Sequence, residues 1–311
     1  MPDQVPDVFS VFRCAICQAT EPVWTSSNIE AARYRACASR LEPARYRACA
    51  SRLEPARYRA CASGHSDHLF SSPGRLMCTG CGTAYAVRNG YLDLHPGDPE
   101  PVPPIQHLMQ CPPIVAVYEA LWRPIGYFIA SKHSFPKDVD RIASLIQRKH
   151  GLILDLACGP GTFTRRIARV APESVVVGFD LSAQMLERAV RLTNKEGLRN
   201  VYYMRGSALS LPFKAEAFDA VTCCGALQLF RDQDQAVGEI ARVLKMQGDF
   251  VCQTTLGPRT PPLWIRMADR MLKFGYFYLD DLKERLYRFN LDLKAEERSN
   301  INYIFRAAKS G

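Results

Sequence analysis

Leu152-Ile-Leu-Asp-Leu-Ala-Cys-Gly-Pro-Gly161 is the stretch that decides the fold of this chain. Its first five residues have the pattern of a buried strand, and they run straight into a glycine-containing turn. The next residues, 162–170, predict a helix that carries Arg165 and Arg166 on its outward face. A second apolar run, Val175-Val-Val-Gly-Phe179, then predicts a strand that ends on Asp180. Strands and helices that alternate in this way are typical of a parallel α/β sheet.

The glycine turn and Asp180 together predict a ligand that contains a ribose. Backbone N–H groups can approach a ligand closely at such a turn, and an acidic residue about 20 positions further on accepts hydrogen bonds from ribose hydroxyls. A nicotinamide site would need a third glycine at position 164, where this chain has threonine, and Asp155 would crowd the pyrophosphate. A carboxylate at position 155 suits the ammonium group of a methionine moiety instead.

Further motifs follow through the second half of the chain. Gly206-Ser-Ala-Leu-Ser-Leu-Pro-Phe213 precedes a strand predicted over 218–222, which opens onto Cys223. A turn at 241–248 leads into the next strand, and residues 302–306 predict a closing antiparallel strand.

In this order and spacing, the motifs resemble the class I S-adenosylmethionine-dependent methyltransferases with a type 11-like domain, over residues 114–311. The resemblance implies an α/β fold with a Rossmann-like, mostly parallel sheet of seven strands, and S-adenosyl-L-methionine as cofactor. Ala157 stands where glycine is usual, and Ser207 replaces an aspartate that accepts from the adenine amino group. The cofactor-binding residues that the resemblance implies are Asp155, Ala157, Cys158, Gly159, Gly161, Asp180, Leu181, Met185, Ser207, Ala208 and Cys223.

The acceptor side of the predicted site carries no strong general base. Cys-Cys-Gly-Ala at 223–226 differs from the Asn/Asp-Pro-Pro-Tyr motif of enzymes that methylate amide or adenine amino groups. Gln228 could orient an acceptor hydroxyl, and Tyr118 and Trp122 could wall an apolar acceptor site or simply pack their helix against the sheet. An acceptor that ionises easily needs no base. We therefore expect a small, apolar or aromatic acceptor, with no catalytic residue assigned.

Two Cys-x-x-Cys pairs, Cys14/Cys17 and Cys78/Cys81, predict a structural zinc site, because four thiolates can take the corners of a tetrahedron. A disulfide framework is one alternative, and it fits less well in a chain without an export signal. A redox pair is the other, but that motif opens a helix in a thioredoxin-like unit, whereas here two copies flank short predicted strands. A hairpin is predicted around Asn89-Gly90.

Over residues 10–95 this pattern resembles the small zinc-ribbon domain that accompanies several methyltransferases, and the proline-rich residues 96–113 are interpreted as a linker. Zinc ribbon, linker and catalytic region together resemble plant chloroplast-type uncharacterised methyltransferases and their bacterial relatives. More distantly, they resemble the zinc-ribbon guanine-N1 methyltransferases of ribosomal RNA.

A tandem repeat of the 12-residue unit ARYRACASRLEP fills residues 32–63, inside the predicted zinc ribbon. It holds eight arginines and two glutamates, and so carries +6 of the formal net charge of +9. Its exact repetition indicates a recent duplication that we expect to be an inert insertion. The small charge of the remaining chain argues against a polyanion as partner.

Three functions stay open on the sequence. We favour methyl transfer to a small molecule over an RNA methyltransferase that uses its zinc ribbon to bind RNA, and over a cofactor-binding regulatory protein without turnover. No apolar stretch of about 18 residues predicts a membrane-spanning helix. The N-terminal residues lack the pattern of a secretory or transit peptide, which predicts a cytoplasmic protein.

Overall fold

The computed structural model describes residues 11–13, 15, 24–25, 74–78, 81–95, 135–257, 263, 267 and 276–311 of the chain. Within these ranges, seven strands come from the second half of the sequence: β5 (Gly151–Leu156), β6 (Ser174–Asp180), β7 (Val201–Arg205), β8 (Phe218–Cys224), β9 (Leu244–Thr255), β10 (Leu291–Ser299) and β11 (Asn302–Lys309). Strands β5 to β9 are parallel to one another, and β11 lies antiparallel between β9 and β10. The mostly parallel α/β fold is confirmed.

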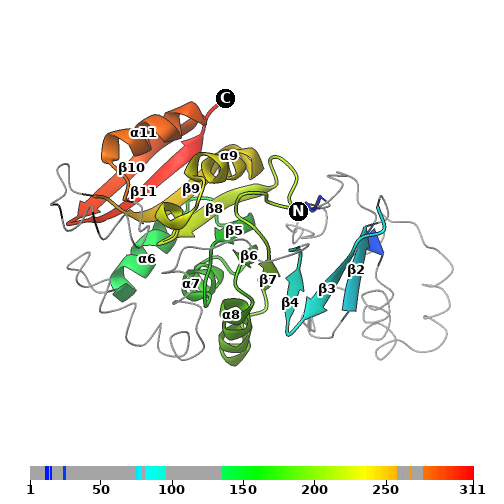
Figure 1. Ribbon diagram of the computed structural model, residues 1–311. Coiled ribbons are helices and arrows are strands. Elements are labelled where there is room, and N and C mark those ends of the chain that lie inside the picture. The colour runs from blue at the N-terminus through cyan, green and yellow to red at the C-terminus, as the bar shows by residue number, and fades with distance from the viewer. Residues whose placement is uncertain are drawn as a thin grey trace, which may run out of the picture.

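Helices cover both faces of this sheet (Figure 1). Apolar side chains of α6 (Phe135–Leu145), α7 (Thr162–Val170) and α8 (Ala183–Lys195) form one core with Ile153 and Val176. Those of α9 (Gln233–Val243) and α11 (Leu279–Arg288) form the other core with Leu154 and Val177. Neighbouring residues of one strand thus serve opposite faces, because successive strand side chains alternate. None of the described helices is long and apolar enough to span a membrane.

Four strands from the first hundred residues extend the same sheet. They are β1 (Trp24–Thr25), β2 (Gly74–Cys78), β3 (Ala84–Arg88) and β4 (Tyr91–Asp93), and the sheet order is β1-β2-β3-β4-β7-β6-β5-β8-β9-β11-β10. The hairpin predicted around Asn89-Gly90 is confirmed, with both residues at positive φ.

Strand β4 joins the two parts of the sheet by pairing in parallel with β7, with Leu92 opposite Met204. Leu92 is fully buried, and Asp93 forms an ion pair with Arg205 at 3.2 Å. The described strands of the 10–95 region therefore share one sheet with the Rossmann-like part. The residues predicted to link the two regions, 96–113, lie outside the described ranges.

Candidate functional site

The predicted cofactor residues gather at the carboxyl ends of β5, β6, β7 and β8. The chain runs outward from β5 through β6 to β7 and then returns to β8 on the other side of β5. The connections therefore diverge between β5 and β8, and ligands of open α/β sheets bind outside the strand ends at such a point.

The glycine turn after β5 presents bare backbone at this edge. Ala157, Gly159 and Gly161 all have positive φ, at 54°, 55° and 77°. No atom lies within 4 Å of the position that a Cβ on Gly159 would take, so a ligand can approach the main chain there. The turn is held to β6 from behind, because the Cys158 amide donates to the carbonyl of Phe179 at 3.1 Å.

Asp180 closes the turn from the end of β6. Its carboxylate accepts from the Gly159 amide and from the Ser182 amide, each at 2.8 Å. Burial raises the pKa of Asp180 above its ordinary value, and these amide hydrogen bonds oppose the rise. Each carboxylate oxygen has a second lone pair, so the group can still accept hydroxyl hydrogens from a ligand.

Asp155 is almost fully buried, at 1% exposure, and both of its oxygens accept hydroxyl hydrogens. Thr164 donates at 2.5 Å from α7, and Thr222 donates at 2.8 Å from β8. The carboxylate thus ties the first turn of α7 to the strand beyond the divergence point. From the sequence, Thr164 only excluded a third glycine, and Thr222 had no assigned role. The sequence signal for both roles is the threonine hydroxyl at positions 164 and 222.

Tyr203 on β7 supports the glycine turn from below, a role that the motifs did not indicate. Its ring crosses Gly178, where a Cβ would lie 2.5 Å from the ring carbon Cε1. Its hydroxyl would lie 2.4 Å from a Cβ on Gly161 and is 2.9 Å from the Thr193 hydroxyl. Gly161 is therefore required by close packing as well as by its positive φ.

Arg165 corrects one expectation from the sequence, because it does not point outward. The residue is 7% exposed, and its side chain donates to the Pro160 carbonyl at 2.5 Å and to Glu196 at 3.1 Å. The guanidinium turns inward because it donates charge-assisted hydrogen bonds to a carbonyl of the glycine turn and to a carboxylate, which replace its hydrogen bonds with water.

The loop after β7 carries Ser207 and Ala208, both half-buried. It is attached to the Asp180 segment by two hydrogen bonds: Gly206 N–H donates to the Asp180 carbonyl at 3.1 Å, and Arg205 Nε donates to the Leu181 carbonyl at 2.9 Å. The Ser207 hydroxyl accepts from the Leu209 amide at 3.1 Å. Ser207 and Ala208, predicted to border the adenine, are thus hydrogen-bonded through their loop to the segment of Asp180, the residue predicted to bind the ribose.

The cysteines at this edge are buried thiols. Burial raises the pKa values of Cys158 and Cys223, and the nearby carboxylates of Asp180 and Asp155 raise them further. A thiol kept protonated is a poor nucleophile, which argues against a nucleophilic role for either side chain. Met185, at 7% exposure, lies in the first turn of α8.

Gln228 lies just beyond β8, in the short 3-10 helix η3 (Leu227–Leu229). Its amide oxygen accepts from the Thr254 hydroxyl at 2.9 Å, and its amide nitrogen donates to the Gly225 carbonyl at 3.3 Å. These two bonds fix which end of the amide faces which partner. Tyr118 and Trp122, the other acceptor-side candidates, lie outside the described residues.

Next to Gln228 lies a chain of hydrogen-bonded, buried polar side chains that no sequence motif indicated. Gln253 donates to Asn302 at 2.6 Å, and Asn302 donates to Asp138 at 3.2 Å. All three are at most 6% exposed, and they connect β9 and β11 to the first turn of α6. No local motif contains them, since they meet only through the sheet.

The predicted zinc site falls partly outside the described residues, because Cys14 and Cys17 are not among them. Cys78 is buried at the end of β2 and Cys81 is exposed, and the Gly82 amide donates to the Cys78 carbonyl at 2.8 Å, which closes the turn between them. Within the described ranges, no group of three or more His, Cys, Asp or Glu residues could hold a metal ion.

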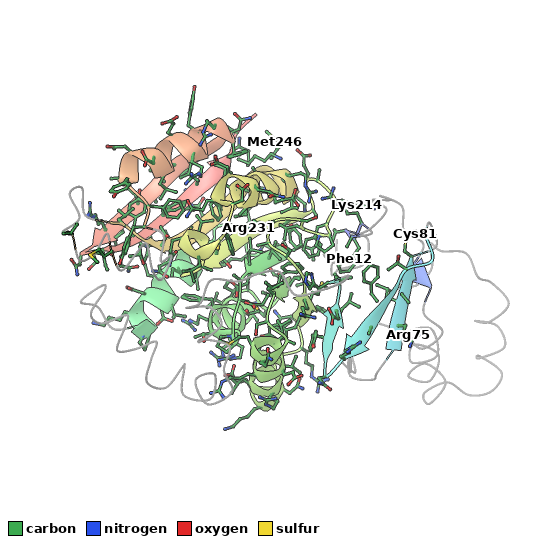
Figure 2. The ribbon with its side chains drawn as sticks, in the orientation of Figure 1. Phe12, Arg75, Cys81, Lys214, Arg231 and Met246 are labelled. Carbon is green, nitrogen blue, oxygen red and sulfur yellow. The ribbon has the colours of Figure 1, made fainter. Side chains whose placement is uncertain are left out.

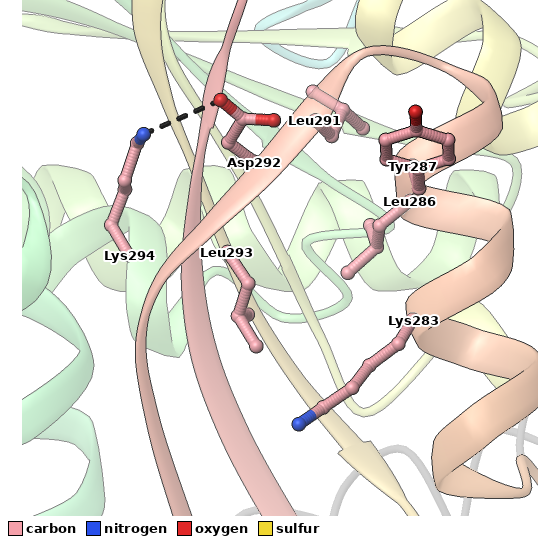
Figure 3. Close-up of a pocket in the computed structure, with 7 residues that line it drawn as sticks. All are labelled: Lys283, Leu286, Tyr287, Leu291, Asp292, Leu293 and Lys294. Atoms are coloured by element: carbon pink, nitrogen blue, oxygen red, sulfur yellow. Dashed lines mark hydrogen bonds and ion pairs between the residues drawn. The ribbon is translucent and has the colours of Figure 1, made fainter.

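A separate hollow lies on α11 and the edge strand β10 (Figure 3). It has a volume of about 370 Å³ and is lined by Lys283, Leu286, Tyr287, Leu291, Asp292, Leu293 and Lys294. Lys294 is paired with Asp292 at 3.4 Å. Three strands, β8, β9 and β11, separate β10 from the glycine turn after β5, so this hollow is not part of the site described above.

Comparison with known proteins identifies the central part of the chain. Residues 153–248 match the family described as a methyltransferase domain. Over 221 residues the chain is 30% identical to an uncharacterized chloroplastic methyltransferase of Arabidopsis thaliana, an alignment that covers 67% of this chain and 62% of that protein. It is 39% identical over 110 residues to the demethylmenaquinone methyltransferase of Lactococcus lactis, which covers 35% of this chain and 44% of that enzyme.

The fold is also that of solved structures. Phosphoethanolamine N-methyltransferase 2 of Haemonchus contortus, in complex with phosphomonomethylethanolamine and S-adenosylhomocysteine, superposes with a TM-score of 0.56 at 18% identity, over 67% of this chain and 59% of that one. Geranyl diphosphate C-methyltransferase of Streptomyces coelicolor superposes with a TM-score of 0.51 at 15% identity, over 56% and 76% of the two chains. Residues 153–248 are thus a methyltransferase domain on a Rossmann-like fold.

Proposed function

We propose that this chain is an S-adenosylmethionine-dependent methyltransferase that acts on a small, apolar or aromatic acceptor. One observation carries the proposal: in a domain that matches the methyltransferase family, the open backbone at Gly159 lies directly beside the Asp180 carboxylate. Backbone without a side chain and a carboxylate with spare lone pairs are what the ribose of a nucleoside cofactor requires.

The residues fit such a cofactor in named roles. Asp180 would accept from the ribose hydroxyls, and Gly159 and Gly161 would leave room for the chain that leads to the sulfur. Met185 and the half-buried Ser207 and Ala208 would border the adenine. Asp155 is held by Thr164 and Thr222, and in this proposal its negative charge favours the ammonium end of the methionine moiety.

The chemistry asked of the protein is mainly placement. S-Adenosylmethionine supplies a methyl group on a positively charged sulfur, which an in-line nucleophile displaces. The protein holds the two reactants in line, keeps water out and orients the acceptor, and such positioning accounts for a large part of the barrier lowering. Gln228, fixed by Thr254 and Gly225, would present a defined amide to the acceptor but cannot remove a proton from it.

Two observations support a small apolar acceptor. Outside the arginine-rich repeat the formal charge is low, which disfavours RNA. The relative from Lactococcus lactis is named a demethylmenaquinone methyltransferase, after a small-molecule substrate.

Calorimetric titration with S-adenosylhomocysteine tests the cofactor assignment. The wild-type chain should bind it, and Asp180→Ala should weaken binding roughly ten- to hundredfold, because a hydrogen bond to a charged group contributes about 1.5–3 kcal/mol. Asp232→Ala is the matched control: Asp232 also accepts a backbone amide at the start of a helix, at 2.9 Å, but it is the N-cap residue of α9. Absence of binding by the wild type contradicts the function, and unchanged affinity of Asp180→Ala contradicts this residue's role.

The same titration should depend on pH through Asp180. Its pKa is raised above 3.8 by burial, so the carboxylate takes up a proton at a higher pH than an exposed aspartate does. The ribose hydroxyls need the ionised acceptor, so affinity should fall on acidification and begin to fall above pH 3.8. Asp180→Ala should lack this step, and an equal step in the variant would assign it to another group.

We also propose that Cys14, Cys17, Cys78 and Cys81 hold a structural zinc ion. The closed turn from Cys78 to Gly82 supports this, because a knuckle needs a tight turn between its two thiolates. The metal would stabilise the strands β1 to β4 and would take no part in methyl transfer.

A further inference from the structure

We propose that Phe12 and Arg13 are positioning residues of the cofactor site, which hold the loop of residues 206–213 in place from the N-terminal end of the chain. This inference rests on the function proposed above. It assigns part of the site to residues outside the 153–248 methyltransferase domain. Phe12 lies beside Lys214, where the N-terminal strands meet the rest of the sheet (Figure 2).

Main-chain hydrogen bonds join the two segments as a short antiparallel bridge between Phe12 and Phe213. The Lys214 amide donates to the Val11 carbonyl at 2.8 Å, and the Arg13 amide donates to the Pro212 carbonyl at 3.2 Å. Bonds on both sides of one residue pair fix the register, so the loop cannot slide along the segment without losing both.

Aromatic rings carry this contact into the site. Phe12 is fully buried, and its ring centroid lies 5.5 Å from that of Phe213, which in turn lies 5.6 Å from that of Phe179. Phe179 directly precedes Asp180, and its ring would touch a Cβ on Gly206 at 2.4 Å. A loss of Phe12 would therefore loosen the packing that sets both Asp180 and the start of the loop.

Charged side chains fix the loop carbonyls from the same side. Arg13 Nε donates to the Leu211 carbonyl at 3.3 Å, and its guanidinium lies 3.6 Å from Glu239 on α9. Glu239 accepts from the Leu211 amide at 2.6 Å, and Arg242 donates to the carbonyls of Leu211 and Phe213. Residues from two distant parts of the chain thus bind both polar groups of Leu211.

The topology explains why the loop needs this support. The connection from β7 to β8, residues 206–217, contains no helix, although parallel strands are usually joined by one that covers the sheet. Phe12, Phe213 and Leu211 are all buried in the core on the α9 side, and they fill the place that a crossover helix would take. The N-terminal segment therefore completes the layer on which the cofactor loop rests.

Calorimetric titration of the full-length chain with S-adenosylhomocysteine tests the proposal. Phe12→Leu and Arg13→Gln should each weaken binding at least threefold. Phe305→Leu is the matched control, since Phe305 is equally buried but packs on Phe250 and Tyr303 away from the loop. It should lower the melting temperature as much as Phe12→Leu does and leave the affinity unchanged within twofold.

Hydrogen exchange gives a second readout that general destabilisation would not produce. Because coupling between two sites is reciprocal, S-adenosylhomocysteine should slow exchange of the Lys214 amide in the wild type and slow it less in Phe12→Leu. Wild-type affinity in both variants, with no ligand effect on Lys214, would overturn the positioning role. Failure of the wild type itself to bind would instead contradict the proposed function, and the positioning role with it.

Discussion

Ala157 adopts a left-handed backbone that suits glycine, at φ 54° in the turn after β5. An L-residue there costs roughly 1–2 kcal/mol, because its Cβ crowds the following carbonyl. The chain tolerates this cost because hydrogen bonds hold the turn on both sides. The Cys158 amide donates to the Phe179 carbonyl of β6, and the Arg165 guanidinium donates to the Pro160 carbonyl.

Ala157→Gly should therefore stabilise the protein. Relief of the left-handed strain is partly offset by the larger freedom of glycine in the unfolded chain, which costs about 0.5–1 kcal/mol. We expect a net gain of up to about 1 kcal/mol in the free energy of unfolding, measured by urea denaturation. Ala84→Gly, in the extended strand β3, should be destabilising, and the idea fails if both changes have the same sign.

At the scale of elements, β6 and β7 pack closely because Gly178 has no side chain. Gly178 pairs with Tyr203 across the strands, and the Tyr203 ring occupies the space that a Cβ would need. The ring cannot swing aside freely, because its hydroxyl is bonded to Thr193 on α8. This packing also fixes the position of the glycine turn relative to β7, because the Tyr203 hydroxyl contacts Gly161.

Gly178→Ala should lower the free energy of unfolding by about 2 kcal/mol, the usual cost of one extra carbon in a filled core. In a Tyr203→Val background the same change should cost under about 1 kcal/mol, since the ring is gone. Chemical denaturation of the four proteins of this cycle measures the coupling. An equal loss of unfolding free energy in both backgrounds would show that the added methyl group does not clash with the Tyr203 ring.

At the scale of the whole molecule, one sheet of eleven strands runs through the described residues from both parts of the chain. Strand β4 adds to β7, and Leu92 and Leu94 join the same core as Phe179. A domain border drawn in the sequence is thus crossed by main-chain hydrogen bonds. We expect the two parts to unfold in a single transition, as one cooperative unit.

Deleting residues 32–55 should leave this unit intact. The deletion removes six arginines and two glutamates from the connection between β1 and β2, whose pairing brings Trp24 opposite Cys78. Loop-closure free energy changes by only about 0.6 kcal/mol when a loop is halved. Melting temperature and S-adenosylhomocysteine affinity should therefore stay close to those of the wild type, and elemental analysis should find about one zinc ion per chain in both proteins.

Leu92→Ala on the fully buried β4 is the contrasting change, and it should lower the melting temperature clearly. If the deletion abolished cofactor binding while the fold survived, the repeat would be a working part of the protein. Loss of zinc in the deletion variant alone would place the metal in the repeat, whose units also contain cysteine.

The sequence by itself determined the strand, turn, helix and strand of residues 152–180, the strands over 218–222 and 302–306, the hairpin at Asn89-Gly90, and the location of Asp155, Gly159 and Asp180 at strand ends. These features depend on residues close together in the chain, whose spacing directly reflects strand and helix geometry. Only the tertiary structure decided the partners of these groups. No local pattern encodes these contacts between elements, since the residues that meet are far apart in the chain. Examples are Thr222 with Asp155, Tyr203 with Gly161, and Arg13 with Leu211, a pair 198 positions apart. The inward turn of Arg165 has the same cause, because a buried carbonyl that needs a donor is visible only once the turn has folded.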